Sequence, residues 1–257
     1  MTARAPRRRG IAGLALISLL MVSVLLSLGF WQLQRRVDKH ALIAALTERL
    51  AAPPAALPDV RNWAALTPAH DEFRRVVFTA TYDKRPDAMV YSSGSAVRDD
   101  ISGPGTWALL PARLPSGQTV VINTGFVQNT MQDRAQQDRA VAPLVTGVTV
   151  TLTGYLRFPD PGGALTPAGD PVKRLWFSRD LRSMAGALGW GEGGELAPFY
   201  VDLEQPVPAN GIPKPAPLSV HLKDDHLQYA ITWFGLAGAV AIAFGFWLFG
   251  QRRRTVA

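Results

Sequence analysis

Two long runs of the sequence contain no charged residue, and this feature constrains the fold more than any other. One run extends from Gly10 to Gln34 and the other from Leu227 to Gln251. Each is longer than the roughly 20 apolar residues that an α-helix needs to cross a hydrocarbon core about 30 Å thick. A charge in the middle of such a helix is energetically costly, so its absence is typical of a membrane span. The sequence therefore predicts two transmembrane helices, one near each end of the chain.

The two spans divide the chain into five parts. We expect a basic cytoplasmic tail over 1–10, a transmembrane helix over 11–31, an extracytoplasmic domain over 32–225, a second transmembrane helix over 226–250, and a basic cytoplasmic tail over 251–257. The first span could instead be a secretory signal peptide. Its apolar run is longer than the usual ~7–15 residues, however, and Ser27 to Trp31 makes a poor cleavage site. An uncleaved anchor is the favoured interpretation.

The formal net charge of +7 arises beside the spans. Seven of the 27 basic residues lie in the two tails, and the other 20 balance the 20 acidic residues. These seven are Arg4, Arg7, Arg8, Arg9, Arg252, Arg253 and Arg254. Short basic segments stay in the cytoplasm and meet anionic head groups, which predicts membrane lipids as partners. The predicted location is a bacterial cytoplasmic (inner) membrane, as a multi-pass protein with both termini inside. No nucleic-acid partner is expected, because no basic stripe with interleaved aromatic residues occurs.

The region between the spans has the patterns of a mainly antiparallel β domain of the α+β class, flanked by the two transmembrane helices. From Val148 to Phe158, apolar residues alternate with Thr, Tyr and Arg, as in a half-buried strand with Val148 on its apolar face. Further strands are predicted at Arg74–Tyr82, Ala88–Val97, Thr106–Leu114, Thr119–Val127 and Pro198–Leu203. Short strands at this spacing indicate a sheet or a small barrel.

Helical and extended patterns complete this region. Residues 34–50 are expected to continue the first helix beyond the membrane, until Pro53-Pro54 stops it. A short helix is predicted over Asp180–Leu188, with Asp180 as its N-cap and Gly189 at its end. The Pro-rich stretch Pro206–Pro217 is expected to be extended and to lead back toward the membrane.

Catalytic constellations are scarce in this sequence. It has no cysteine, its four histidines show no metal-ligand spacing, and no nucleophile or nucleotide-loop motif occurs. No catalytic residue is predicted, and the chain is not expected to be an enzyme. The adjacent acids Asp224 and Asp225 are expected to be solvated. Gly235, Ala239 and Ala243 are small residues at helical spacing, which permits close contact with the first span or with a partner's helix.

The candidate ligand is His226, at the start of the second span. On a continuing helix, Tyr229, Ala230 and Trp233 fall on its face. An imidazole at the membrane–water boundary could ligate haem iron, with the aromatic rings beside a porphyrin and Ala230 leaving room. Alternatively, His226 is a helix-start residue that hydrogen-bonds to head groups or to Asp225, and the residues alone favour this simpler interpretation.

Six motifs, in order, resemble the surfeit locus family of cytochrome c oxidase assembly factors, and the resemblance covers the chain from about Leu14 to Trp247. The motifs are Leu28–Arg36 followed by Lys39, Arg74–Tyr82, Gly105–Pro111, Thr119–Val127, Gly154–Arg157 with Trp176–Leu181, and His226–Leu236. His226–Leu236 is similar to the second-helix signature and is the most specific of them. The sequence differs from the residues usual in the family at Asn123-Thr124-Gly125 and at Gly162–Pro171. These differences bear on surface contacts more than on the fold.

This resemblance implies a role in maturing haem–copper oxidases of the respiratory chain. A member of the family would act as a chaperone that delivers haem a to cytochrome c oxidase subunit I or stabilises its insertion. The resemblance implies haem a synthase and subunit I as partners, haem a as a transient cofactor, and His226 as a ligand of the haem iron, with Tyr229 and Trp233 beside it. The alternative is a membrane scaffold that binds no haem and holds an oxidase subunit during assembly.

Overall fold

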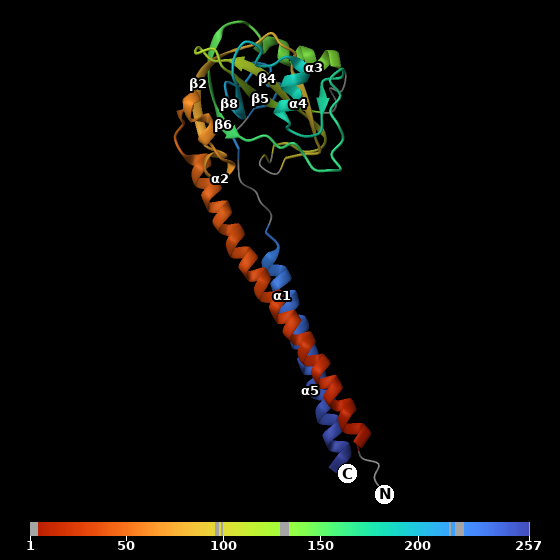
Figure 1. The fold of residues 1–257 in the computed structure, drawn as a ribbon. Helices are drawn as coiled ribbons and strands as arrows, with labels where there is room; N and C mark the ends of the chain where they lie inside the picture. Colours follow the sequence, from red (N-terminus) through yellow and green to blue (C-terminus); the bar gives the residue numbers. More distant parts are fainter. Residues whose placement is uncertain are drawn as a thin grey trace. The chain divides into compact units, whose positions relative to one another are not determined.

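The structure is a computed structural model that describes residues 5–95, 98, 100–128, 134–215, 217–218 and 224–256. The chain forms two compact units. The first consists of Met1–Ala44 and Lys223–Ala257, and the second consists of Ala45–Leu222 (Figure 1). The predicted strand Ala88–Val97 and the predicted extended stretch Pro206–Pro217 each include positions outside the described residues.

The first unit is built from two long helices, α1 (Ala5–Ala51) and α5 (His226–Val256). Both are long and apolar enough to cross a membrane. Large apolar side chains such as Leu16, Ile242 and Phe246 stand exposed on them, as expected of surfaces that face lipid rather than water. The helix α1 continues through 34–50 and ends directly before Pro53-Pro54, as predicted, because proline cannot continue an α-helix.

The second unit contains a closed barrel of five strands. These are β2 (Arg75–Tyr82), β6 (Thr149–Arg157), β8 (Leu196–Gln205), β5 (Thr119–Gln128) and β4 (Gly105–Arg113), paired in that order. The strand β4 pairs with β2 again through Thr81↔Arg113 and Tyr82↔Ala112, which closes the circle. On the edges, β3 (Ala88–Ser92) pairs with β4, β7 (Leu175–Trp176) with β3, and β1 (Ala55–Ala56) with β2.

The β-rich α+β class and the small barrel are as predicted, but the sheet is mixed. The strands β5 and β8 run parallel, as do the pairs β1–β2 and β3–β7, whereas the other pairs are antiparallel. Parallel neighbours need a long connection rather than a tight turn. Between β5 and β8 the chain makes α3 (Arg134–Val141), the 3₁₀ turn η3 (Ala142–Leu144), β6, β7 and α4 (Leu181–Leu188).

Two apolar clusters hold this unit together, one on each face of the central strands. Leu110, Ile122 and Phe199 belong to the first, with Trp63 from the 3₁₀ helix η1 (Val60–Ala65), which precedes α2 (Pro68–Asp71). The second includes Trp107, Val121 and Tyr200 of the alternate strand positions, packed with Met184 of α4. Because β4 and β5 are covered on both faces, they are buried at every position but the last and lack the alternation of a half-buried strand.

The predicted caps of α4 are confirmed, whereas the predicted burial of one residue at β6 is wrong. Asp180 Oδ1 accepts a hydrogen bond from the Ser183 backbone N–H at 3.1 Å, and Gly189 ends the helix with a φ of 71°. Val148 was assigned to the buried face of β6, but it lies one residue before the strand and is 62% exposed. It precedes the first paired residue, so no neighbouring strand covers it.

Candidate functional site

A stripe of polar residues runs along one face of α1. Gln32, Arg36 and His40 are spaced four residues apart, and side chains at that spacing lie above one another on a helix. Gln32 interacts with the first residue of α5, and Arg36 and His40 interact with Asp224, two residues before it. The stripe therefore joins the two helices of the first unit at the point where α5 begins.

His226 is the first residue of α5, and its ring is held by α1. The ring Nδ1 lies 2.7 Å from the side-chain oxygen Oε1 of Gln32. A carboxamide oxygen can only accept a hydrogen bond, so Nδ1–H of His226 is the donor. Within the described part of the chain, no hydrogen bond involves the other ring nitrogen, Nε2. The imidazole therefore has one nitrogen fixed and one nitrogen available.

Asp224 connects His226 to the C-terminal end of the stripe on α1. Its Oδ1 accepts a hydrogen bond from the His226 backbone N–H at 3.0 Å, and its Oδ2 lies 2.7 Å from Nε2 of His40. Arg36 Nε is 3.8 Å from the same oxygen. The backbone N–H of His226 and the ring of His40 together hold the pKa of the Asp224 carboxyl below its usual value. The side chain is only 14% exposed, so the prediction that this acid is solvated is wrong.

On the N-terminal side of the polar stripe in α1, small residues let α1 and α5 approach closely. A Cβ added at Gly29 would lie 2.5 Å from a ring carbon of Phe234, and Phe234 also packs edge-on against Phe30 with centroids 5.3 Å apart. Ala230 and Ala237 of α5 are buried. The small-residue contact therefore falls at Gly29, Ala230 and Ala237. The face of Gly235, Ala239 and Ala243 is exposed, so it does not form the contact with α1, and its contact with a partner's helix stays a prediction.

The two aromatic residues placed beside His226 by helical spacing differ in position. Tyr229 is 55% exposed and so lies on the outer side of α5. Trp233 is half-buried, and its Nε1 is buried without a hydrogen-bond partner among the described residues. Whether either ring borders a ligand stays a prediction. Spacing alone missed the partners of His226, although the stripe Gln32, Arg36 and His40 was visible as an i, i+4, i+8 pattern.

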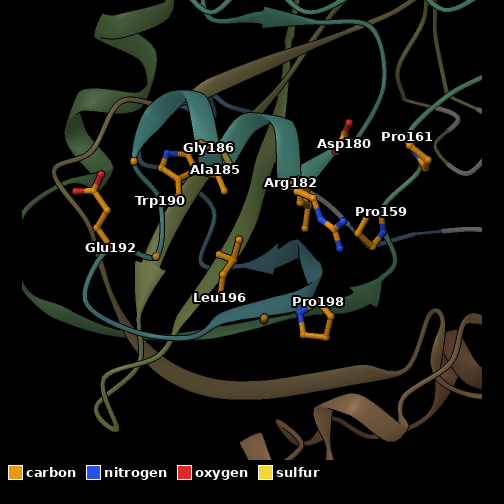
Figure 2. A pocket seen from close by; sticks show the side chains of 14 residues that line it. Pro159, Pro161, Asp180, Arg182, Ala185, Gly186, Trp190, Glu192, Leu196 and Pro198 are labelled. Atoms are coloured by element: carbon orange, nitrogen blue, oxygen red, sulfur yellow. The ribbon is translucent and has the colours of Figure 1, made fainter.

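An open groove lies beside α4 in the described part of the second unit. It has a volume of about 930 Å³ and is lined by apolar residues such as Leu181, Trp190 and Leu196, and also by Arg182 and Glu192 (Figure 2). Of its three prolines, Pro159 and Pro161 follow β6 and Pro198 lies in β8. The groove brings no titratable cluster or nucleophile together, so it gives no chemical assignment.

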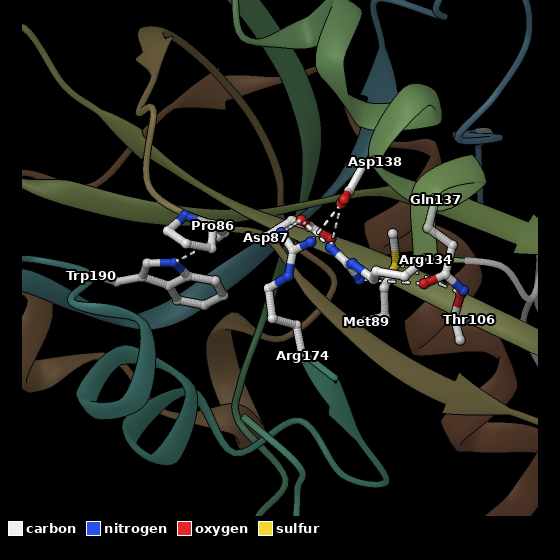
Figure 3. A network of polar contacts seen from close by, with 9 residues as sticks. All are labelled: Pro86, Asp87, Met89, Thr106, Arg134, Gln137, Asp138, Arg174 and Trp190. Atoms are coloured by element: carbon white, nitrogen blue, oxygen red, sulfur yellow. Dashed lines mark hydrogen bonds and ion pairs between the residues drawn. The ribbon is translucent and has the colours of Figure 1, made fainter. Parts of the chain in front are cut away.

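A buried acid near this groove belongs to the framework of the fold. Asp87 is almost fully buried and accepts hydrogen bonds from the guanidinium groups of Arg134 and Arg174 (Figure 3). Arg174 also donates to Asp138 at 2.7 Å. Because a buried carboxylate must be compensated by opposite charge, this network clamps α3 and the β7 segment onto the start of β3. All its charged members are paired with one another, which indicates a structural role.

These features define a class of protein in which a small mixed β-barrel domain accompanies two apolar helices, with a tethered histidine where the second helix begins. The model of the SURF1 family matches residues 19–238. The chain therefore belongs to the SURF1 family, which confirms the resemblance inferred from the six motifs.

Similar proteins come from distant organisms. The SURF1-like protein of Monosiga brevicollis is 30% identical over 259 residues, covering 98% of this chain and 92% of that protein. Surfeit locus protein 1 of Homo sapiens is 27% identical over 240 residues, covering 88% of this chain and 74% of that protein. The SURF1-like protein of Rickettsia bellii is 25% identical over 231 residues, covering 86% and 85%. The similarity thus includes both apolar helices and the barrel.

Proposed function

We propose that this chain is an assembly factor for haem–copper cytochrome c oxidase, which delivers haem a to subunit I or stabilises its insertion. Membership in the SURF1 family supports the assembly role. One structural observation supports the haem role above all others. The ring of His226 is tethered at Nδ1 and has no hydrogen bond at Nε2 within the described residues, at the first position of an apolar helix.

The residues at this position suit a haem. Haem iron takes an imidazole nitrogen as an axial ligand, and Nε2 of His226 is the nitrogen that would hold it. The porphyrin is apolar, and the exposed apolar surface of α5 below His226 suits it better than water does. Tyr229 and Trp233 are the rings that would border the macrocycle, whereas Ala230 is buried and does not face it. Bound haem would supply a chromophore and an iron centre for transfer.

A single histidine from this chain is suited to carrying a haem that must later leave. One axial bond is easier to exchange than two, and the oxidase subunit supplies the final ligands in this scheme. We therefore infer a carrier rather than an enzyme, with haem a synthase as the donor of the haem and subunit I as its acceptor. The cofactor is cargo, bound transiently.

The same proposal fixes a topology. The two apolar helices span a bacterial cytoplasmic membrane, the basic tails lie in the cytoplasm beside the lipid head groups, and the barrel domain lies outside. His226 then lies at the outer membrane–water boundary. This arrangement presents a bound haem at the depth where a membrane-embedded oxidase subunit can accept it.

The optical spectrum of protein purified from cells that make haem a tests this function. We expect a haem spectrum for the wild type, its loss or a clear shift for His226→Ala, and no change for His70→Ala. His70 is a matched control because it is an exposed histidine of the second unit. A wild type without haem, or a His226→Ala variant with an unaltered spectrum, contradicts the haem role.

Co-purification of subunit I separates delivery from scaffolding. A scaffold that binds no haem keeps its hold on subunit I when His226 is replaced and when haem is depleted. A carrier instead leaves subunit I short of haem a in the His226→Ala strain, although the cells still make haem a. Full oxidase activity in that strain would favour the scaffold.

A further inference from the structure

We propose that Gln32 is a positioning residue, which sets the tautomer of His226 and leaves Nε2 as the ligand atom. This inference rests on the proposed function and identifies the side chain that orients the proposed haem ligand. It starts from the 2.7 Å contact between His226 Nδ1 and Gln32 Oε1. No other described side chain hydrogen-bonds to the His226 ring. Gln32 is therefore the partner that sets the ring's orientation.

The tautomer decides which nitrogen can bind a metal. A neutral imidazole carries one proton, so one nitrogen donates a hydrogen bond and the other keeps a lone pair. With Oε1 of Gln32 facing Nδ1 at 2.7 Å, the proton resides on Nδ1 and the lone pair on Nε2. Histidines that ligate metals commonly donate their second ring N–H to an outer partner in this way, which fixes both tautomer and ring orientation. The ring of His226 is thus prepared before any ligand arrives.

The rest of the site holds Gln32 and His226 in register. On the apolar side, the close approach at Gly29 sets the distance between α1 and α5 one turn from Gln32. On the polar side, Asp224 binds the His226 backbone N–H and contacts His40, two turns along the same stripe. Two contacts therefore bracket the hydrogen bond between Gln32 and His226. A hydrogen bond held in this way beside an apolar phase is stronger than one in water.

The neutral amide also suits a ligand that must be released. A carboxylate in place of Gln32 would orient the ring equally well, but it would make the imidazole more basic and strengthen its bond to iron. An amide orients the ring without that added charge. Gln32 therefore combines a prepared ring with exchangeable ligation, which is the requirement for a carrier.

The ligand-free protein gives the first test. In full-length protein labelled with ¹⁵N-histidine, the difference spectrum against His226→Ala identifies the signals of His226. We expect Nδ1–H and an unprotonated Nε2 in the wild type, and loss of this preference in Gln32→Ala. Gln34→Ala is the matched control, because Gln34 lies on the same helix and donates to Asp38 at 3.1 Å instead. Protonation of Nε2 rather than Nδ1 in the wild type overturns the inference.

Titration with haem a gives the second test. Loss of an outer partner of a ligating histidine typically weakens metal binding about 10- to 100-fold, so Gln32→Ala should raise the Kd by about tenfold or more. Gln32→Glu should bind haem more tightly than the wild type and lower its midpoint potential, whereas Gln34→Ala should match the wild type. A purely structural role for Gln32 would not give opposite effects in these two variants.

The outcomes separate this inference from the proposed function. If the wild type binds haem and Gln32→Ala binds it equally well, the role of Gln32 is overturned while the haem function stands. If the wild type shows the Nδ1–H tautomer but binds no haem, the haem function fails and the orientation of His226 by Gln32 stands. Helix content measured by circular dichroism identifies any variant that has lost its fold. If Gln32→Ala does not fold, Gln32→Glu still tests the role of this side chain, because it preserves the length and polarity of the residue.

Discussion

Asp224 shows how one side chain can serve two contacts. It accepts the backbone N–H of His226 and contacts the ring of His40, and these partners lower the pKa of its carboxyl from the ordinary value of 3.8. A carboxyl with a lowered pKa contributes stability above its ordinary pKa, and this contribution is lost as the pH falls through the lowered value. The junction of α1 and α5 should therefore be sensitive to acid.

Replacement of Asp224 by Asn tests this dependence. The variant should be less stable than the wild type at neutral pH, and the difference should shrink as the pH falls below about 3.8. Thermal unfolding in detergent across a pH series measures it. Asp38→Asn is the control, since Asp38 accepts a hydrogen bond from Gln34 on α1 itself and, among the described residues, makes no hydrogen bond or ion pair with α5. A difference that persists unchanged at low pH would refute the role of the charged carboxylate.

Thr124 illustrates how a surface interpretation can fail at a single residue. The residues Asn123-Thr124-Gly125 differ from those usual in the family, and this difference was expected to affect surface contacts. The side chain of Thr124 is fully buried instead, and its hydroxyl donates to the Ala108 carbonyl at 3.0 Å. The register of β4 and β5 shifts at this point, so Thr124 is the extra residue of a bulge. A position that reads as polar is here part of the barrel wall.

At the scale of elements, the pairing of α1 with α5 depends on small residues at the contact. Spacing on α5 alone indicated Gly235, Ala239 and Ala243, but the contact uses Gly29 of α1. Helices without a hydrophobic driving force between them associate where backbones can approach closely. Several small faces exist on each apolar helix, and which one is used depends on the shape of the partner.

Gly29→Leu should therefore separate the two helices. A side chain at this position meets the ring of Phe234, whereas Gly13 on the same helix has nothing within 4 Å of its added Cβ. We expect Gly29→Leu to abolish the Nδ1–H preference of His226 and to weaken haem binding by about tenfold or more, as loss of an outer partner does. Gly13→Leu should behave as the wild type. Equal haem affinity in both variants would exclude a role for this contact in the site.

At the scale of the whole molecule, the distribution of charge predicts the topology. The basic tails flank both apolar helices, and the remaining charges balance. We expect a fluorescent reporter fused after Ala257 to be active, because green fluorescent protein matures in the cytoplasm but not after export in an unfolded state. A phosphatase reporter inserted at the exposed Leu165 should be active only outside the cytoplasm. The reverse pattern would contradict the proposed placement of His226.

Much of the architecture could be predicted because its signals are local. The end of α1 before Pro53-Pro54 and the caps of α4 at Asp180 and Gly189 follow from the chemistry of single residues. The strands of the barrel were recognised, although β4 and β5 are buried on both faces and lack clean alternation. The parallel pairing of β5 with β8 was not foreseen, because periodicity within a strand does not report the direction of its neighbour.

The candidate site could be predicted only in part. His226 was proposed from its position at the start of an apolar run, since a polar imidazole there is conspicuous, and its role as a ligand stays a prediction. Gln32 is separated from it by 194 positions in the sequence, and nothing local to either residue indicates the other. Asp224 was taken for a solvated acid, because burial beside His40 depends on how α1 and α5 meet.

The sequence by itself determined the two apolar helices, the β-rich domain, the family and the histidine at the start of α5. These are properties of hydropathy, periodicity and motif, which each segment carries on its own. Only the tertiary structure decided that the barrel closes from β4 to β2, that Gly29 is the point of helix contact, and that Gln32 holds Nδ1 of His226. Such contacts join residues distant in sequence, and they exist only once packing has brought their backbones within a few ångströms.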